Sequence, residues 1–253
     1  MKTFVLTGGA SGIGEGIKKQ LISEGHKVIS IDLHNADIES DLGNSTGRQA
    51  AIAKAIELTP AGIDGFIGCA GVGSNIVNVA LIPSVNFFGA IDLLVGLRDL
   101  IVKVRGSVVL ISSNSAPGET NPDYLEALLN HDEAAAVNIA SSMQGHPAYS
   151  GSKLALARWM RRNNADYAKQ GIRLNAVAPG YIRTAMTASV EADPDYGPAI
   201  KNFVNSIPMQ RPGEPEDIAK SVSFLLSDAA SFVSGSLLFV DGGHDAMHRP
   251  DSI

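Results

Sequence analysis

The chain has 253 residues, of which 45% are hydrophobic, so it is neither disordered nor fibrous and fits one large domain or two small ones. Its formal net charge of −6, without a long basic block, argues against nucleic acid as a partner. The single cysteine, Cys69, excludes an internal disulfide and a thiolate metal cluster, and it indicates a reducing compartment.

The first residues and the longest apolar runs bear on where the protein resides. Residues 3–7 form an apolar run that is too short for the core of a signal peptide. No stretch approaches the roughly 18 apolar residues that a membrane-spanning helix requires. The histidines show no spacing typical of a metal site. We therefore expect a cytoplasmic protein with no membrane span and no bound metal.

Short apolar runs alternate with amphipathic stretches along the chain. We expect strands at residues 3–7, 27–31, 66–70, 107–112, 173–178 and 236–240, and a third strand within residues 36–42. We expect helices at residues 12–23, 45–58, 91–102, 148–169 and 215–226, with no long helix before the third strand. Strands alternating with helices are typical of parallel βαβ units. The sequence therefore predicts an α/β fold, a single Rossmann-type domain over residues 1–253 with a doubly wound parallel seven-stranded sheet.

Residues 114–148 interrupt this alternation. A loop of that length in a compact domain usually has structure and a purpose of its own. Two parts of it, residues 124–129 and 133–142, are compatible with helices. We expect a helical insertion that overhangs the entrance of a cleft just before Tyr149.

A glycine cluster follows the first expected strand and opens the first expected helix. In Thr7-Gly8-Gly9-Ala10-Ser11-Gly12-Ile13-Gly14, Gly8 permits a tight turn, Gly12 lets a phosphate approach the backbone, and Gly14 lets helix and strand pack closely. The free N–H groups at the helix start would then face a pyrophosphate. Taken alone, the cluster is equally compatible with an ordinary tight turn. Its position between strand and helix favours a dinucleotide site.

Asp32 ends the second expected strand, close to the spacing of about 20 residues expected for a carboxylate that binds the adenosine ribose. The carboxylate would repel a 2′-phosphate, and Leu33 supplies no cation to attract one. His34 is mostly neutral at pH 7. We therefore expect NAD rather than NADP as cofactor. The alternative is that Asp32 is an ordinary turn residue.

Tyr149 and Lys153 stand four residues apart, so on a helix they share one face. A free tyrosine has a pKa of about 10 and is a poor base at neutral pH. A neighbouring ammonium, together with the positive charge of an oxidised nicotinamide, would lower the pKa of the phenol. The pair thus suits proton transfer, although by itself the pattern is also that of a surface pair.

Together these motifs, with Ser113 and Pro179-Gly180, resemble the short-chain dehydrogenase/reductase family from Lys2 to about Gly243. The resemblance implies that Ser113 binds the substrate oxygen, with Ser112 as the rival, and that Asn86 holds a water near Lys153. The catalytic set that it implies is Asn86, Ser113, Tyr149 and Lys153. The cofactor contacts that it implies are Gly8, Ser11, Gly12, Ile13, Gly14, Asp32, Leu33, Asp41, Leu42, Ala70, Gly71, Tyr149, Lys153, Pro179, Gly180, Ile182 and Thr184.

In the resemblance, Asp41-Leu42 and Ala70-Gly71 lie beside the adenosine, whereas Ile182 and Thr184 meet the nicotinamide carboxamide. One departure is Gly68-Cys69, where the family often has two asparagines, which puts the hydrogen bonding of that stretch in doubt. We interpret Cys69 as a small buried apolar residue.

The substrate region is residues 181–209, where Met186, Val190, Tyr196, Ile200 and Phe203 suit an apolar ligand or plain core packing. Asp193-Pro194-Asp195-Tyr196-Gly197, the segment after Asp241, and the insertion resemble the bacterial subgroup of 3α-hydroxysteroid dehydrogenases/carbonyl reductases. That subgroup implies NAD(H)-dependent interconversion of a steroid 3α-hydroxyl and a 3-oxo group. The alternatives are another alicyclic alcohol or carbonyl, or a dinucleotide-binding regulator without catalysis.

Family members often pair through the helices after strands four and five, here residues 88–102 and 149–169. The insertion abuts that region, so we expect a homodimer through residues 215–226 and the last strand. A tetramer is the alternative.

Overall fold

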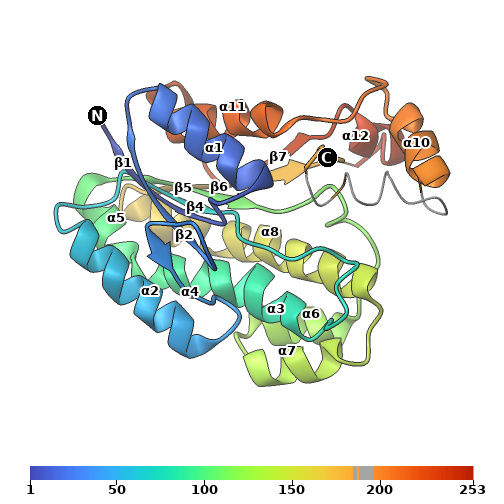
Figure 1. The fold of residues 1–253 in the computed structure, drawn as a ribbon, viewed down its shortest axis with the longest axis horizontal. Helices are drawn as coiled ribbons and strands as arrows, with labels where there is room; N and C mark the ends of the chain where they lie inside the picture. The colour runs from blue at the N-terminus through green and yellow to red at the C-terminus, as the bar shows by residue number, and fades with distance from the viewer. Residues whose placement is uncertain (185–186, 188–196, 253) are drawn as a thin grey trace.

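The computed structural model describes residues 1–184, 187 and 197–252. Its strands form one sheet in the order β3-β2-β1-β4-β5-β6-β7, with every neighbouring pair parallel (Figure 1). The strands are β1 (Thr3–Thr7), β2 (Lys27–Asp32), β3 (Ile38–Glu39), β4 (Gly65–Gly68), β5 (Ser107–Ile111), β6 (Arg173–Pro179) and β7 (Leu237–Val240). The prediction of a doubly wound, seven-stranded parallel sheet is confirmed.

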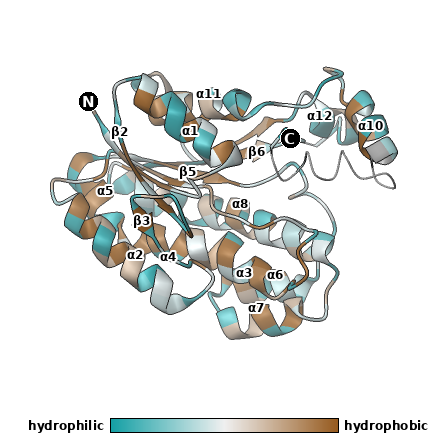
Figure 2. Cartoon of the chain, viewed as in Figure 1, coloured by the Kyte–Doolittle hydropathy of each residue, from teal (hydrophilic) through white to brown (hydrophobic). Residues whose placement is uncertain are grey.

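Helices cover both faces of the sheet because side chains alternate along each strand. Phe4 and Leu6 pack with helices α1 (Gly12–Ser23) and α11 (Pro215–Leu226), whereas Val5 packs into the opposite core. That opposite core is covered by α2 (Ser45–Leu58), α4 (Gly89–Gly96), α5 (Arg98–Val104) and α8 (Gly145–Lys169). Figure 2 shows hydrophobic residues along the strands, and both hydrophobic and hydrophilic residues on the covering helices.

The third strand covers two residues within the expected segment, residues 36–42. Asp37 turns back toward β2, where its carboxylate accepts hydrogen bonds from the Ser30 N–H (2.8 Å) and hydroxyl (2.6 Å). Burial is the largest single influence and raises the pKa of Asp37. The bonds from Ser30 and the charge of Lys18 together outweigh it, so the pKa lies below its ordinary value. The chain thus passes from β2 to β3 without a helix, as predicted, and only Ile38–Glu39 pairs with β2.

The expected helix at residues 91–102 begins earlier and is broken. It follows α3 (Leu81–Pro83) and a π-helix, η1 (Ser84–Phe88), and it divides at Leu97 into α4 and α5. Gly96 precedes the break and contacts α2 so closely that a Cβ there would lie 2.7 Å from Ile52 Cδ1. The residues here are almost continuously apolar, so the sequence shows no clear helical period. The start and the break of this helix therefore could not be predicted from the sequence.

The insertion contains α6 (Pro122–Leu129) and α7 (Glu133–Ala140), as predicted. Asn121 and Asp132 cap these helices through their side chains. Helix α6 packs against α8, and α7 lies against α3 and η1. None of residues 114–148 lines the cavity that opens at the carboxyl ends of the strands, so the expectation that the insertion overhangs the entrance stays a prediction.

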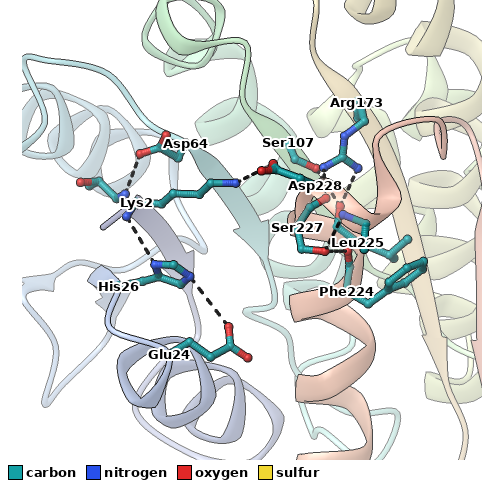
Figure 3. Close-up of polar contacts among 12 residues, drawn as sticks. Lys2, Glu24, His26, Asp64, Ser107, Arg173, Phe224, Leu225, Ser227 and Asp228 are labelled. Carbon is teal, nitrogen blue, oxygen red and sulfur yellow. Dashed lines mark hydrogen bonds and ion pairs between the residues drawn. The ribbon is translucent and has the colours of Figure 1, made fainter.

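Polar contacts tie down the amino-terminal edge of the sheet (Figure 3). Arg173 donates to the carbonyl of Leu225 (2.6 Å) and to that of Ser227 (3.1 Å) at the end of α11. At β1, Thr3 N–H donates to Asp64 (2.7 Å). Burial lowers the pKa of Arg173, and Asp228 opposes this effect. A cation at the carboxyl end of a helix is favourable.

The remaining described helices are η2 (Asp228–Ala230), α10 (Gly197–Ser206) and α12 (His244–His248).

Candidate functional site

A cavity of about 410 Å³ opens at the carboxyl ends of the strands. It lies where the strand order reverses between β1 and β4, which is where ligands bind in sheets of this kind. All seventeen expected cofactor residues line it, as do Ser113, Tyr149 and Lys153. Residues that the sequence did not single out also line it: Ser40, Gly43, Val72, Gly73, Leu81, Val85, Ile111, Tyr181 and Thr187.

The glycine turn has the geometry expected of a phosphate-binding loop. Gly8 has a positive φ of 76°, and a Cβ there would lie 2.7 Å from both N and Cα of Ala70. A Cβ on Gly14 would lie 1.8 Å from the Gly8 oxygen. Ser11 makes no side-chain cap on α1. The amide dipoles at the start of α1 therefore stand beside the cavity, where they suit an anion.

Asp32 lies beside this turn at the end of β2. Its carboxylate accepts hydrogen bonds from the N–H groups of Ala10 (2.9 Å) and Leu33 (2.8 Å), and it lines the cavity. Each carboxylate oxygen has a further acceptor position. The side chain is thus held in place with capacity to accept from ribose hydroxyls.

Thr7 is a positioning residue that the sequence argument missed. Its buried hydroxyl accepts hydrogen bonds from the N–H groups of Cys69 and Ala70, both at 3.0 Å, which ties the end of β1 to the loop after β4. It therefore orders this loop despite the departure at Gly68-Cys69. Burial raises the pKa of the Cys69 thiol to about 12 despite the nearby Lys153 cation, so the thiol stays protonated.

Tyr149 and Lys153 lie on the first turns of α8. The Lys153 ammonium lies 5.7 Å from the centre of the Tyr149 ring and donates to the Ile111 carbonyl (2.9 Å). The Ser113 hydroxyl, just after β5, lines the same cavity and acts to lower the pKa of the Tyr149 phenol. A phenol, a hydroxyl and a buried ammonium thus meet at the edge of the cavity.

In the protein without cofactor, burial raises the pKa of the Tyr149 phenol, and the Ser113 hydroxyl only partly offsets this effect. The expected lowering of this pKa included the positive charge of an oxidised nicotinamide, so it stays a prediction for the complex. Burial also lowers the pKa of Lys153 to about 8. The reason is the low polarity around both groups, which disfavours each charged form. The Tyr149 phenol is therefore protonated at neutral pH.

The two serines at the end of β5 have different partners. The Ser112 hydroxyl donates to the backbone carbonyl of Lys153 (2.8 Å), whereas the Ser113 hydroxyl accepts from the Ser115 N–H (3.1 Å) and hydroxyl (2.9 Å). The Ser112 hydroxyl thus donates its proton to the backbone, whereas the Ser113 hydroxyl acts as acceptor in both of its bonds and keeps its own proton available. The geometry therefore favours Ser113 over Ser112 as the partner of a substrate oxygen.

Asn86 lies on the π-helix η1 behind the cavity and does not line it. Its side chain accepts from the Val72 N–H (2.8 Å) and donates to the Val72 carbonyl (3.1 Å). A Cβ on Gly71 would lie 3.2 Å from the Asn86 oxygen and 3.5 Å from the Lys153 ammonium. Asn86 and Lys153 thus approach each other across Gly71, and the side chain of Asn86 orders the loop after β4.

The remaining expected contacts lie at the two ends of the cavity. Asp41 and Leu42 form a turn before α2, while Gly180 follows β6 and its N–H donates to the Val240 carbonyl (3.0 Å). Thr184 lies close to the glycine turn, since its methyl group is 3.3 Å from where a Cβ on Gly12 would lie. Pro179 and Ile182 also line this end.

Part of the expected substrate region falls outside the described residues, including Met186, Val190 and Tyr196. Of the others, Ile200 and Phe203 are on α10, and the Phe203 ring contacts the rings of Tyr181 (5.9 Å) and His244 (5.0 Å). Among the described residues, no helix is long and apolar enough to cross a membrane. Nor do three or more acidic, histidine or cysteine side chains there gather as a metal site.

Comparison with known families defines the class of protein. Residues 2–125 match the family described as short chain dehydrogenase, and residues 122–245 match the family described as Enoyl-(Acyl carrier protein) reductase. The chain belongs to the short-chain dehydrogenase/reductase family, which is a family of oxidoreductases that use NAD(H).

Individual relatives are similar over nearly the whole chain. The chain is 37% identical to 3-alpha-hydroxysteroid dehydrogenase/carbonyl reductase of Comamonas testosteroni, over 99% of each chain. It is 31% identical to 2,5-dichloro-2,5-cyclohexadiene-1,4-diol dehydrogenase of Sphingobium indicum, over 97% of this chain and 98% of the relative. The crystal structure of the 3-alpha-hydroxysteroid dehydrogenase from Pseudomonas sp. B-0831 complexed with NADH is 41% identical, with a TM-score of 0.92 over 99% of this chain and 100% of the other.

Proposed function

We propose that the protein is an NAD(H)-dependent oxidoreductase that interconverts a secondary alcohol and a ketone, and that its substrate is the 3α-hydroxyl or 3-oxo group of a steroid. The observation that carries this proposal is that Ser113, Tyr149 and Lys153 line the same cavity as the glycine turn and Asp32. A proton-transfer group and a dinucleotide site thus share one space.

The residues present fit NAD(H). The glycine turn leaves no room for side chains at Gly8 and Gly14, and the start of α1 stands beside the cavity. Beside the glycine turn, the fixed carboxylate of Asp32 suits two ribose hydroxyls and disfavours a 2′-phosphate. In the NAD(H) complex, the chemistry supplied by the cofactor is hydride acceptance from the alcohol carbon, or hydride donation in reverse.

The protein residues then handle the oxygen and its proton. Ser113 and Tyr149 both offer a hydroxyl to the substrate oxygen, which places fixed donors where negative charge develops during ketone reduction. Tyr149 gives its proton to that oxygen in reduction and takes it back in oxidation. Lys153 stabilises the phenolate through its charge, and Asn86 supports the loop beside it.

A steroid substrate is supported by the two hydroxysteroid dehydrogenases that are similar to this chain over nearly its full length. The test is NADH formation with androsterone, its 3β epimer and cyclohexanol. We expect turnover with androsterone to exceed that with the epimer by at least about 100-fold, since a misplaced hydroxyl loses its alignment with the hydride acceptor. Equal turnover of the two epimers would refute the steroid proposal.

A cyclic diol or another alicyclic alcohol is the second candidate, favoured by the similarity to the dichlorocyclohexadiene diol dehydrogenase. Faster turnover of cyclic diols than of any steroid in the same assay would support it. A non-catalytic regulator is the third, and turnover of any alcohol that is lost in Tyr149→Phe would exclude it.

We also propose a homodimer in the cytoplasm. Helix α6 covers part of α8, while Phe224 on α11 and Leu238 on β7 are partly exposed and Phe232, between these two elements in the chain, is fully exposed. Exposed large apolar residues suit an interface. Sedimentation of the purified protein as a tetramer would contradict this arrangement.

A further inference from the structure

Arg48 is a fully buried cation near the start of α2, with 1% of its surface exposed. Its N–H bonds to the carbonyl of the N-cap residue Asn44, so it lies within the first turns of the helix. A positive charge near the amino-terminal end of a helix is unfavourable because the helix dipole is positive there. Its burial therefore depends on specific partners.

The Arg48 guanidinium joins the Rossmann core to the insertion. Its Nε donates to Asp92 on α4 (2.7 Å). Its Nη1 donates to one oxygen of Glu133, the first residue of α7 (3.1 Å), and its Nη2 donates to the other oxygen. Two parallel bonds to one carboxylate fix the orientation of both side chains, which a lysine cannot do. His131, just before α7, also approaches Asp92 (2.9 Å).

The same guanidinium reaches the wall of the dinucleotide cavity. Its Nη1 donates to the backbone carbonyl of Leu42 (3.2 Å), and Leu42 lines the cavity between Asp41 and Gly43. On the other side of this turn, the Asp41 carboxylate accepts from the Gly43 N–H (2.8 Å) and the Asn44 amide (2.8 Å). The turn is thus stabilised by hydrogen bonds to the Asp41 carboxylate, and its Leu42 carbonyl is fixed by the Arg48 guanidinium.

We propose that Arg48 is a positioning residue for the adenine end of the NAD(H) site, and that the insertion takes part in cofactor binding through Glu133. Arg48 does not line the cavity, so it acts through the Leu42 carbonyl. Without the guanidinium, the turn at Asp41–Gly43 relaxes and the adenosine loses a preformed wall. The inference rests on the proposed NAD(H) function.

The experiment compares Arg48→Met, Arg48→Lys and Glu133→Gln with the unaltered protein. For each, the KM for NAD, the kcat at saturating NAD and the inhibition constant of ADP-ribose against NAD are measured. We expect Arg48→Met to raise the KM and the inhibition constant together by at least fivefold, with kcat within twofold. Glu133→Gln is expected to raise both at least twofold, and Arg48→Lys to give an intermediate value.

A merely structural role would lower kcat through loss of folded enzyme and leave the inhibition constant of ADP-ribose unchanged. The control is Lys54→Met, which removes a cation from the same helix by breaking an exposed ion pair with Glu57. It should leave all three quantities unchanged. If Arg48→Met does not fold, Arg48→Lys and Glu133→Gln decide the question, since both keep a cation at the site.

An unchanged inhibition constant in folded Arg48→Met or Arg48→Lys would overturn the role of Arg48. An unchanged constant in Glu133→Gln alone would overturn the part of the insertion. Failure of the unaltered protein to bind NADH or ADP-ribose would instead refute the proposed function.

Discussion

The Ser112 hydroxyl donates a 2.8 Å hydrogen bond to the backbone carbonyl of Lys153, which ties the end of β5 to the part of α8 that carries Tyr149 and Lys153. This carbonyl belongs to the helical residue whose ammonium in turn donates to Ile111 on β5. The strand and the helix are therefore joined by two buried, reciprocal bonds. They fix where Tyr149, one turn earlier on the helix, stands relative to Ser113.

Alanine substitutions of the neighbouring residues Ser112 and Ser113 should have different effects on activity and on stability. We expect Ser113→Ala to lower kcat/KM by about 100- to 1,000-fold, because it removes a donor to the developing negative charge. Ser112→Ala should cost about 1 kcal/mol of folding free energy by removing a buried hydrogen bond to the Lys153 carbonyl, with a smaller loss of activity. Steady-state kinetics and urea unfolding measure the two effects. The reverse pattern would assign the substrate contact to Ser112.

Tyr149 should control the pH dependence of alcohol oxidation. Its pKa is raised above the ordinary value by burial, so the phenol is protonated at neutral pH and the base form grows about tenfold per pH unit below that pKa. We therefore expect kcat/KM for oxidation to rise between pH 6 and 8, where Lys153 keeps much of its charge. Ketone reduction, which uses the protonated phenol, should not rise over this range.

Tyr149→Phe is the matched variant for this profile. It removes the hydroxyl alone, so kcat should fall by at least about 1,000-fold while the dissociation constant for NADH changes less than threefold. Fluorescence titration with NADH measures the binding. Turnover that persists in this variant with the same pH profile would remove Tyr149 from the mechanism.

Local patterns predicted much of the site, whereas contacts between distant segments did not follow from the sequence. The glycine turn, Asp32 and the Tyr149–Lys153 pair are each set by a few adjacent residues, and all line the cavity. Arg48 could not be found in this way, because its acidic partners lie 44 and 85 residues away along the chain.

The bounds of some helices and strands likewise follow from local sequence patterns, whereas others depend on tertiary contacts. Strand and helix periods located β1, α1, α2 and α11 at their observed residues. The short β3 depends on the bonds between Asp37 and Ser30, and the break at Leu97 depends on packing of the preceding glycine against Ile52. Such tertiary contacts override the local period.

Asp32 should determine the preference for NAD over NADP. Asp32→Ser removes the negative charge at the ribose position, so we expect the KM for NAD to rise about tenfold and the KM for NADP to fall. The ratio of kcat/KM for the two cofactors should shift toward NADP by about 100-fold. A ratio that stays unchanged would mean that another residue excludes the 2′-phosphate.

Lys153 should reduce the stability of the fold while serving the reaction. Burial lowers its pKa from 10.5 to about 8, so at pH 7 the folded state holds a disfavoured cation. Between about pH 8 and 10.5 the folded chain binds fewer protons than the unfolded chain, and stability from this group rises with pH. Below that window the cost is fully present.

We expect Lys153→Met to raise the free energy of unfolding at pH 7 by roughly 2–3 kcal/mol, taking about 1.4 kcal/mol for each pKa unit and subtracting about 1 kcal/mol for the lost bond to Ile111. The gain should shrink or reverse by pH 10, while turnover falls strongly at both pH values. Urea unfolding of the variant and the parent at each pH provides the comparison. A gain that is the same at pH 7 and pH 10 would contradict a charge-based cost.

The substitution Gly151→Ala should test how tightly the insertion packs against α8. It lies on α8 between Tyr149 and Lys153, and a Cβ there would lie 2.2 Å from the Thr120 hydroxyl and 2.9 Å from the Tyr124 ring. In an exposed helix, a Gly→Ala change stabilises by about 1 kcal/mol. Here the overpacking should prevail, and we expect Gly151→Ala to destabilise the fold by about 1–3 kcal/mol.

The double variant Gly151→Ala with Thr120→Ala tests this contact directly. Thr120→Ala alone removes the bond from its hydroxyl to the Pro147 carbonyl at the start of α8 (3.0 Å) and should be mildly destabilising. In the double variant, the space freed by the hydroxyl should restore part of the stability and of kcat, with a coupling of about 1 kcal/mol. Strictly additive effects would show that the insertion yields to the added methyl group without moving the helix that carries Tyr149.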